Sequence, residues 1–212
     1  MIKRPWLILT SNFIVFCFIL PTTFSCKTEA PREAQKTLSS AYNYNRRGLL
    51  HYQKAKDNRF VMYDRLKLAI EDFDQAVKLD SANPQYYYNR GRARLSAMYE
   101  TDTLVAKDFH QAIALDSTFS DAFHFLGNYY TGIGDFKLAE LNLRKAIEIN
   151  PAKDLPYHNL AGAFLKSSQY DSAIHYYDLA IFMSSDDDVI SRAKYLRGRA
   201  LWKKKSETSN SN

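Results

Sequence analysis

Five histidines are the side chains of this 212-residue chain best suited to bind a metal or exchange protons near neutral pH. They are His51, His110, His124, His158 and His175. His124 and His158 occupy equivalent places in two consecutive copies of an internal repeat, which puts them on neighbouring helices. A shared metal ion is one interpretation, because imidazole is a common zinc ligand. We favour the other interpretation, in which two repeated histidines contact a bound ligand or water.

Other motifs that carry chemistry are missing or incomplete. Gly132-Ile133-Gly134 lacks the third glycine and the preceding strand of a dinucleotide-binding loop. The chain has no phosphate-binding loop, no His-Glu pair at zinc spacing and no serine elbow. Residues 186–188 are three aspartates that suit the positive end of a following helix, with a calcium site as the alternative. We therefore predict a protein without enzyme activity, cofactor or metal.

The composition predicts a folded, helical body. Hydrophobic residues make up 46% of the chain and charged residues 25%, which is enough for a packed core. The net charge is +6, and basic and acidic residues are mixed along the chain, so charge gives no argument for a nucleic-acid partner. Only 7 glycines occur, and few segments carry strand or turn signals, so we expect an all-α fold.

The N-terminus has the order of a secretory signal peptide. Lys3 and Arg4 precede an apolar stretch from Trp6 to Leu20, and small and polar residues then lead to Ser25 and Cys26. Ser25-Cys26 after such a stretch resembles the cleavage box of bacterial lipoproteins, which implies a signal peptide over 1–25 and a lipid on Cys26. Residues 26–40 would then form a tether on an exported protein that is anchored to the bacterial cell envelope, on the outer membrane or the periplasmic face. The alternative is an uncleaved anchor over residues 5–26, which carry no charge.

The body of the chain repeats itself with a period of about 34 residues. The stretch 121–151 aligns with 155–185, so that Leu126 falls on Leu160, Gly127 on Ala161 and Ala146 on Ala180. Two more copies lie upstream, the first with a nine-residue insertion and the second with a two-residue insertion. Small residues at fixed places let two helices approach closely, and large apolar residues fill the space beside them.

These residues resemble the tetratricopeptide repeat, a helix-turn-helix unit of about 34 residues. The resemblance implies an all-α, right-handed superhelical solenoid of such units with a C-terminal capping helix. We place the repeat domain at 41–205, with repeats at about 41–83, 84–119, 120–153 and 154–187. The capping helix follows at 191–205, and residues 206–212 form a disordered tail. The insertion in the first repeat is expected to lengthen both of its helices or to form a loop.

The resemblance also implies a concave groove that is lined by the first helix of each repeat and binds a partner segment. Counting along each repeat selects aromatic, amide, imidazole and arginine side chains for this lining. The expected partner-binding residues are Asn45, Tyr88, Arg92, His124, Asn128, His158, Tyr195 and Arg199. Arginines bind carboxylates well, so the partner is expected to be acidic near the C-terminal end of the groove.

Three functions remain open from the sequence. The first is a non-enzymatic adaptor or scaffold of the cell envelope, which binds a protein or peptide in the groove and the membrane through its N-terminal lipid. The second is a structural subunit that associates with its own copies or a fixed partner and has no groove ligand. The third is a carrier of a small ligand.

Overall fold

The structure is a computed structural model that describes residues 32–97 and 103–210. The predicted signal peptide, Cys26 and the start of the predicted tether lie outside the described residues. The described residues form nine α-helices and one short 3-10 helix, and they contain no strand. Among residues 32–97 and 103–210, every helix is too short or too polar to span a membrane.

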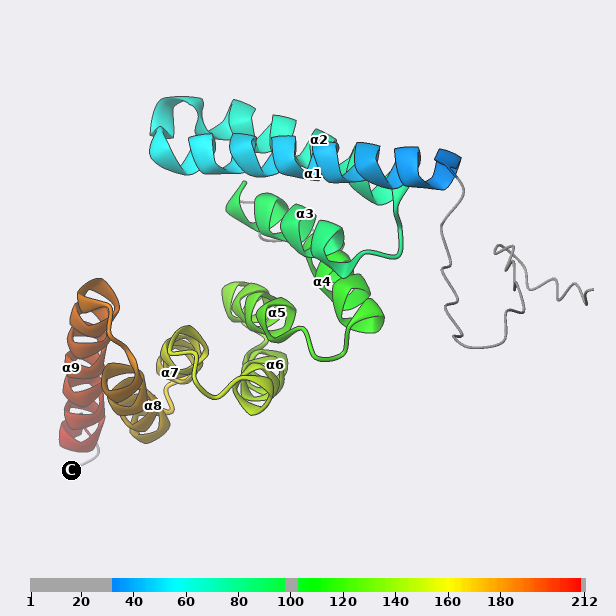
Figure 1. The fold of residues 1–212 in the computed structure, drawn as a ribbon. Coiled ribbons are helices and arrows are strands. Elements are labelled where there is room, and N and C mark those ends of the chain that lie inside the picture. Colours follow the sequence, from blue (N-terminus) through cyan, green and yellow to red (C-terminus); the bar gives the residue numbers. More distant parts are fainter. Residues whose placement is uncertain (1–31, 98–102, 211–212) are drawn as a thin grey trace, which may run out of the picture.

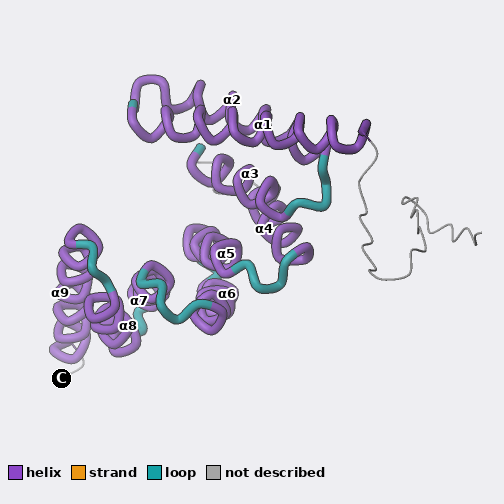
Figure 2. The backbone as a smooth tube through the Cα atoms, viewed as in Figure 1, coloured by secondary structure: helices purple, strands orange, loops and turns teal. Residues whose placement is uncertain are grey.

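The helices follow one another in antiparallel pairs, which confirms the all-α repeat fold (Figure 1, Figure 2). We call the earlier member of each pair the first helix and the later member the second helix. The pairs are α1 (Arg32–Asp57) with α2 (Met62–Leu79), α3 (Pro84–Ser96) with α4 (Thr103–Leu115), α5 (Ser120–Ile133) with α6 (Phe136–Ile149), and α7 (Leu155–Lys166) with α8 (Tyr170–Met183). The single helix α9 (Asp187–Asn210) ends the array.

The ends of the repeat domain differ from the predicted boundaries. Helix α1 begins at Arg32, inside the segment predicted as a tether, and α9 runs from Asp187 to Asn210 through most of the predicted tail. The insertion in the first repeat lengthens both helices, since α1 has 26 residues and α2 has 18. The 3-10 helix Arg59–Val61 joins the two, and the Phe60 side chain at this tip is 99% exposed.

Glycine on each of three first helices lets the second helix come close. A Cβ atom on Gly48 would lie 2.7 Å from the Phe73 ring, and one on Gly127 would lie 2.5 Å from Cγ of Leu143. Gly91 has the same relation to Phe109, at 3.0 Å. Real Cβ contacts essentially never fall below 3.0 Å, so the close approach at Gly48 and Gly127 needs glycine, as the repeat pattern predicts, and the contact at Gly91 is tighter than most.

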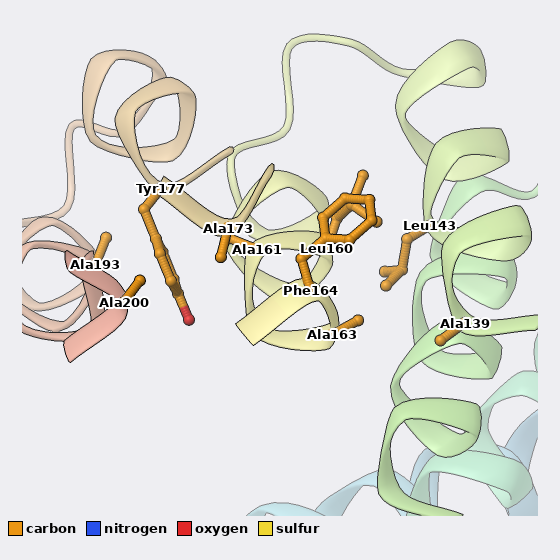
Figure 3. Packing of buried hydrophobic residues seen from close by; sticks show 10 residues of the cluster. All are labelled: Ala139, Leu143, Leu160, Ala161, Ala163, Phe164, Ala173, Tyr177, Ala193 and Ala200. Carbon is orange, nitrogen blue, oxygen red and sulfur yellow. The ribbon is translucent and has the colours of Figure 1, made fainter. Parts of the chain in front are cut away.

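The apolar core runs along the array between consecutive helices. In Figure 3, Leu143 of α6 points toward Leu160 and Phe164 of α7. Farther along the array, Ala200 of α9 lies beside Tyr177 of α8. Phe164 is 3% exposed and the other four side chains are fully buried, so one core cluster extends from α6 to α9.

Helix ends follow the local sequence. Asn83 caps α3 ahead of Pro84, and the Asp135 side chain accepts a hydrogen bond from the Leu138 amide at the start of α6. Gly134 ends α5 with φ of +83°, a left-handed conformation that favours glycine. Of the two glycines predicted to lie in this turn, Gly134 therefore does so, whereas Gly132 lies in the last turn of α5.

Candidate functional site

The first helices lie on the inner side of the curve that the array follows, and the second helices lie on the outer side (Figure 1). Consecutive first helices also touch one another, since α3 contacts α1 and α5, and α7 contacts α5 and α9. Side chains on the inner side therefore either bridge two first helices or remain available to a partner.

Arg92 of α3 is held by three aromatic rings from three different first helices. Its guanidinium carbon lies 5.0 Å from the ring centre of Tyr52 and 5.2 Å from those of Tyr88 and Phe125. These are cation–π distances, so the rings fix the position of the charge. The Nε atom of Arg92 is buried without a hydrogen-bond partner.

None of the ion pairs found within residues 32–97 and 103–210 involves Arg92. The neighbouring arginines of the same helix, Arg90 and Arg94, both bind the buried carboxylate of Asp108, at 2.7 Å each. They fasten α3 to α4, whereas Arg92 lies against the three rings and pairs with no carboxylate of the described chain. A fixed guanidinium of this kind is suited to bind an anionic group that comes from outside the chain.

Three predicted groove residues instead bridge adjacent first helices. Asn45 and His124 are buried, and each accepts a hydrogen bond from the next first helix. Asn45 Oδ1 accepts from Asn89 Nδ2 at 2.8 Å, and His124 Nε2 accepts from Asn159 Nδ2 at 2.5 Å. Tyr88 occupies the same place in the second repeat, and its ring packs edge-on against Phe125 at 5.7 Å. The three partners Asn89, Phe125 and Asn159 also share one repeat position, which comes directly after the position of Asn45, Tyr88 and His124 in the next repeat.

Asn159 links the two histidines that the sequence places one period apart. Its amide nitrogen contacts Nε2 of His124, and its Oδ1 lies 3.3 Å from Nδ1 of His158. Asn128 approaches the same Nε2 of His124, at 3.5 Å. Within the described part of the chain, no group of three or more potential metal ligands is found. The geometry is that of a hydrogen-bonded chain of imidazole and amide groups.

Burial keeps both imidazoles neutral at physiological pH. It lowers the pKa of His124 to about 4, although the nearby carboxylate of Asp121 opposes the shift. Burial also lowers the pKa of His158, whose Nε2 is buried without a hydrogen-bond partner. Neutral His124 accepts the hydrogen bond from Asn159, because only an unprotonated ring nitrogen can accept.

A cleft of about 370 Å³ lies between α7, α8 and α9 at the C-terminal end. Arg199, one of the predicted residues, lines it together with Lys166 and Lys203, and Gly162 leaves the space open. The Tyr177 hydroxyl at its wall is buried without a hydrogen-bond partner, and burial raises the pKa of that hydroxyl to about 12. The cleft is therefore basic, and the unsatisfied hydroxyl is buried in its wall.

The predicted residues fall into two groups in the structure. Arg92, Asn128 and His158 are partly buried and Arg199 is exposed, whereas Asn45, Tyr88 and His124 are buried in contacts within the chain. Tyr195 is 68% exposed on α9, since no described helix follows to cover it. Sequence reasoning missed Tyr52, Phe125 and Asn159, although Phe125 and Asn159 stand one period apart and could have been found as a repeated pair.

Comparison with known proteins agrees with this architecture. Residues 120–153 match the family model described as tetratricopeptide repeat. No curated protein sequence shows significant similarity to the chain.

Several solved structures have the same fold. PilF of Pseudomonas aeruginosa is 14% identical and has a TM-score of 0.64, over 82% of this chain and 72% of PilF. A thermophilic TPR protein of Thermus thermophilus is 16% identical, with a TM-score of 0.62 over 77% of this chain and 87% of its own. YrrB, described as a TPR protein with an unusual peptide-binding site, is 19% identical, with a TM-score of 0.59 over 82% of each chain.

The sequence match covers one repeat, and the structural similarity covers most of the array. Both agree with the repeat spacing in the sequence. Residues 120–153 are therefore a tetratricopeptide repeat, and the array as a whole has the fold of tetratricopeptide repeat proteins.

Proposed function

We propose that this protein is a non-enzymatic adaptor that binds an acidic segment of a partner protein on the inner side of its helical array. Proteins of this repeat family are in general interaction scaffolds, and the structurally similar YrrB is described as having a peptide-binding site. The observation that carries the proposal is Arg92, whose guanidinium is fixed over three rings without a carboxylate among the described residues.

The partner's chemistry follows from the groups that remain available. Arg92 offers a cation whose position is already fixed, so little conformational entropy is lost when a carboxylate binds. Arg199, Lys166 and Lys203 add positive charge around the cleft at the C-terminal end. Asn128 is partly buried on α5, the first helix between α3 and α7, and its side-chain amide can bind a peptide backbone with one donor and one acceptor.

The binding test uses a fluorescein-labelled pool of peptides with glutamate at alternate positions and random apolar residues between them. We expect Arg92→Gln to weaken binding about tenfold or more, because a charge-assisted hydrogen bond is lost. Arg92→Lys keeps the charge but not the planar stacking on three rings, so it should restore binding only in part. Arg144→Gln is the matched control, since Arg144 already binds Glu140 and the Tyr176 hydroxyl on the outer side of the array.

Fluorescence polarisation measures the affinities, and thermal unfolding checks that each variant is folded. Equal affinity of the wild type and Arg92→Gln for the acidic pool would refute the assignment of Arg92. Concentration-dependent oligomers in sedimentation, unchanged by Arg92→Gln and without peptide binding, would support the structural subunit instead.

The cell-envelope location belongs to the same proposal and rests on the N-terminal sequence. Basic residues, an apolar stretch and Ser25-Cys26 occur in the order of a lipoprotein signal peptide. The test is intact mass and membrane fractionation of the wild type beside Cys26→Ala. We expect a wild-type chain that begins at Cys26 and carries added acyl mass, with neither property in the variant. A full-length chain in the membrane fraction would contradict the lipid anchor.

A further inference from the structure

Helix α9 repeats the pattern of a first helix but has no second helix of its own among the described residues. Gly48, Gly91 and Gly127 each receive a large side chain from the second helix of their repeat, at 2.5 to 3.0 Å from the position of a Cβ atom. Gly198 stands at the corresponding place in α9, where a Cβ atom would meet nothing within 4 Å. The surface that receives a second helix is therefore present and uncovered.

The opposite side of α9 is packed as in the other repeats. Ala193 and Ala200 are fully buried in the core that contains Tyr177 of α8. Ala122 and Tyr129 of α5 are buried in the same way, in the core that contains Phe109 of α4. Helix α9 thus lies on the preceding second helix as a regular first helix does, and only its own partner helix is missing from the described array.

Large apolar side chains surround Gly198 on the uncovered side. Tyr195, Leu201 and Trp202 are 68%, 43% and 66% exposed. At about 100° per residue, all three lie within about 60° of Gly198 around the helix. A helix that only terminates a solenoid presents polar residues to water, so this apolar surface is unexpected for an end cap.

Charge decides which kind of helix fits this surface. Lys194 and Lys205 lie beside Gly198 on the same side of the helix. The segment 187–210 contains seven basic and three acidic residues. A second copy of α9 would bring two positive surfaces together, whereas an acidic helix would place carboxylates opposite the lysines.

We propose that the α9 face, which consists of Lys194, Tyr195, Gly198, Leu201, Trp202 and Lys205, binds an acidic amphipathic helix of a partner protein. The bound helix takes the place of a second helix and completes a fifth repeat, with a leucine or aromatic side chain over Gly198. This site lies at the end of the array and is independent of the partner segment proposed for the inner side.

The probe is a peptide with the sequence of α6 that carries Lys137→Glu, Arg144→Glu and Lys145→Glu. In its own repeat, α6 places Leu143 against Gly127 of the first helix. The peptide therefore carries a leucine that can pack over Gly198 in the same way. The unmodified α6 peptide is the matched control, because it has the same apolar side but three basic residues in place of the three glutamates. Binding to the full chain is measured by fluorescence polarisation and by NMR shifts of the Trp202 side chain.

We expect the acidic peptide to bind at least about tenfold more tightly than the unmodified one. Gly198→Gln should weaken the binding of the acidic peptide by about tenfold or more, because the glutamine side chain fills the space over α9 that the peptide would occupy. The same substitution should leave the melting temperature unchanged or raise it, since glutamine favours a helix more than glycine does. Loss of binding will then not be due to loss of folding.

Three results would overturn this assignment. The first is failure of the acidic peptide to bind more tightly than the unmodified peptide, and the second is equal affinity for the wild type and Gly198→Gln. The third is a dimer of the free chain that Gly198→Gln dissociates, which would assign the α9 face to a second copy. Arg92→Gln should leave the binding of the acidic α6 peptide unchanged, so this test and that of the inner side can fail separately.

Discussion

Protonation of His124 is expected to destabilise the protein in mild acid. The imidazole is buried, and its Nε2 accepts a hydrogen bond from Asn159 of the next first helix. A proton on Nε2 would turn the acceptor into a donor facing an amide N–H group, and the added charge would be buried. The perturbation to apply is a fall in pH from 7 to 5.

The size of the effect follows from the difference in pKa between the folded and unfolded states. The pKa of His124 is about 4 in the folded chain and 6.5 when the residue is exposed. The unfolded state therefore binds more protons between these values, so the free energy of unfolding decreases as the pH falls. At about 1.4 kcal/mol per pH unit the full loss is about 3.4 kcal/mol, of which about 2 kcal/mol falls between pH 7 and pH 5.

Urea unfolding of the wild type and His124→Gln at pH 7, 6 and 5 measures this contribution. Glutamine retains an oxygen that can accept from Asn159 but does not titrate, so the variant should lose about 2 kcal/mol less than the wild type over this range. His175→Gln, on the exposed side of α8, serves as the control and should follow the wild type. If the wild type and His124→Gln lose the same stability, or if NMR gives His124 a pKa between 6 and 7, the reasoning is refuted.

Two further predictions concern packing. Gly127→Ala should reduce the free energy of unfolding by about 1 to 3 kcal/mol, because its Cβ would lie 2.5 Å from Leu143. Gly132→Ala on the same helix would meet nothing within 4 Å, so it should raise the free energy of unfolding by up to about 1 kcal/mol. Chemical denaturation of the pair gives both values, and equal effects would show that the close approach of α5 and α6 is not needed. Tyr177→Phe should raise the free energy of unfolding by about 1 kcal/mol, since it removes a buried hydroxyl without a partner. A marked decrease of the free energy of unfolding in the same experiment would mean that the hydroxyl makes a hydrogen bond in solution.

The repeat pattern carries enough information to predict the fold, because small residues at a fixed period report where two helices must touch. Gly127 meets Leu143 as the spacing predicts, and Gly134 lies in the turn between α5 and α6. The ends of the array were predicted less well. Helix α1 extends N-terminally to Arg32, since its first turns contain glutamate, glutamine and lysine, which are good helix formers. Helix α9 extends to Asn210 through residues 206–210, which include no glycine or proline to break the helix.

The inner lining was harder to predict, because the spacing within one helix does not show which neighbouring helix a side chain will meet. Asn45, Tyr88 and His124 share one repeat position, and all three are used between first helices. Arg92 was predicted to bind a partner, and its surroundings in the structure depend on Tyr52 and Phe125. Those rings come from other repeats, and no pattern within α3 points to them.

The order of helix contacts has a mechanical consequence. Each described helix contacts only helices that are one or two places away along the chain, so no contact joins the two ends of the described array. In such a structure, strain applied at one end is transmitted from repeat to repeat and is absorbed first by the weakest interface. The protein should therefore behave as a soft spring, which yields to tension by opening one helical pair at a time and recovers its length when the pairs close again.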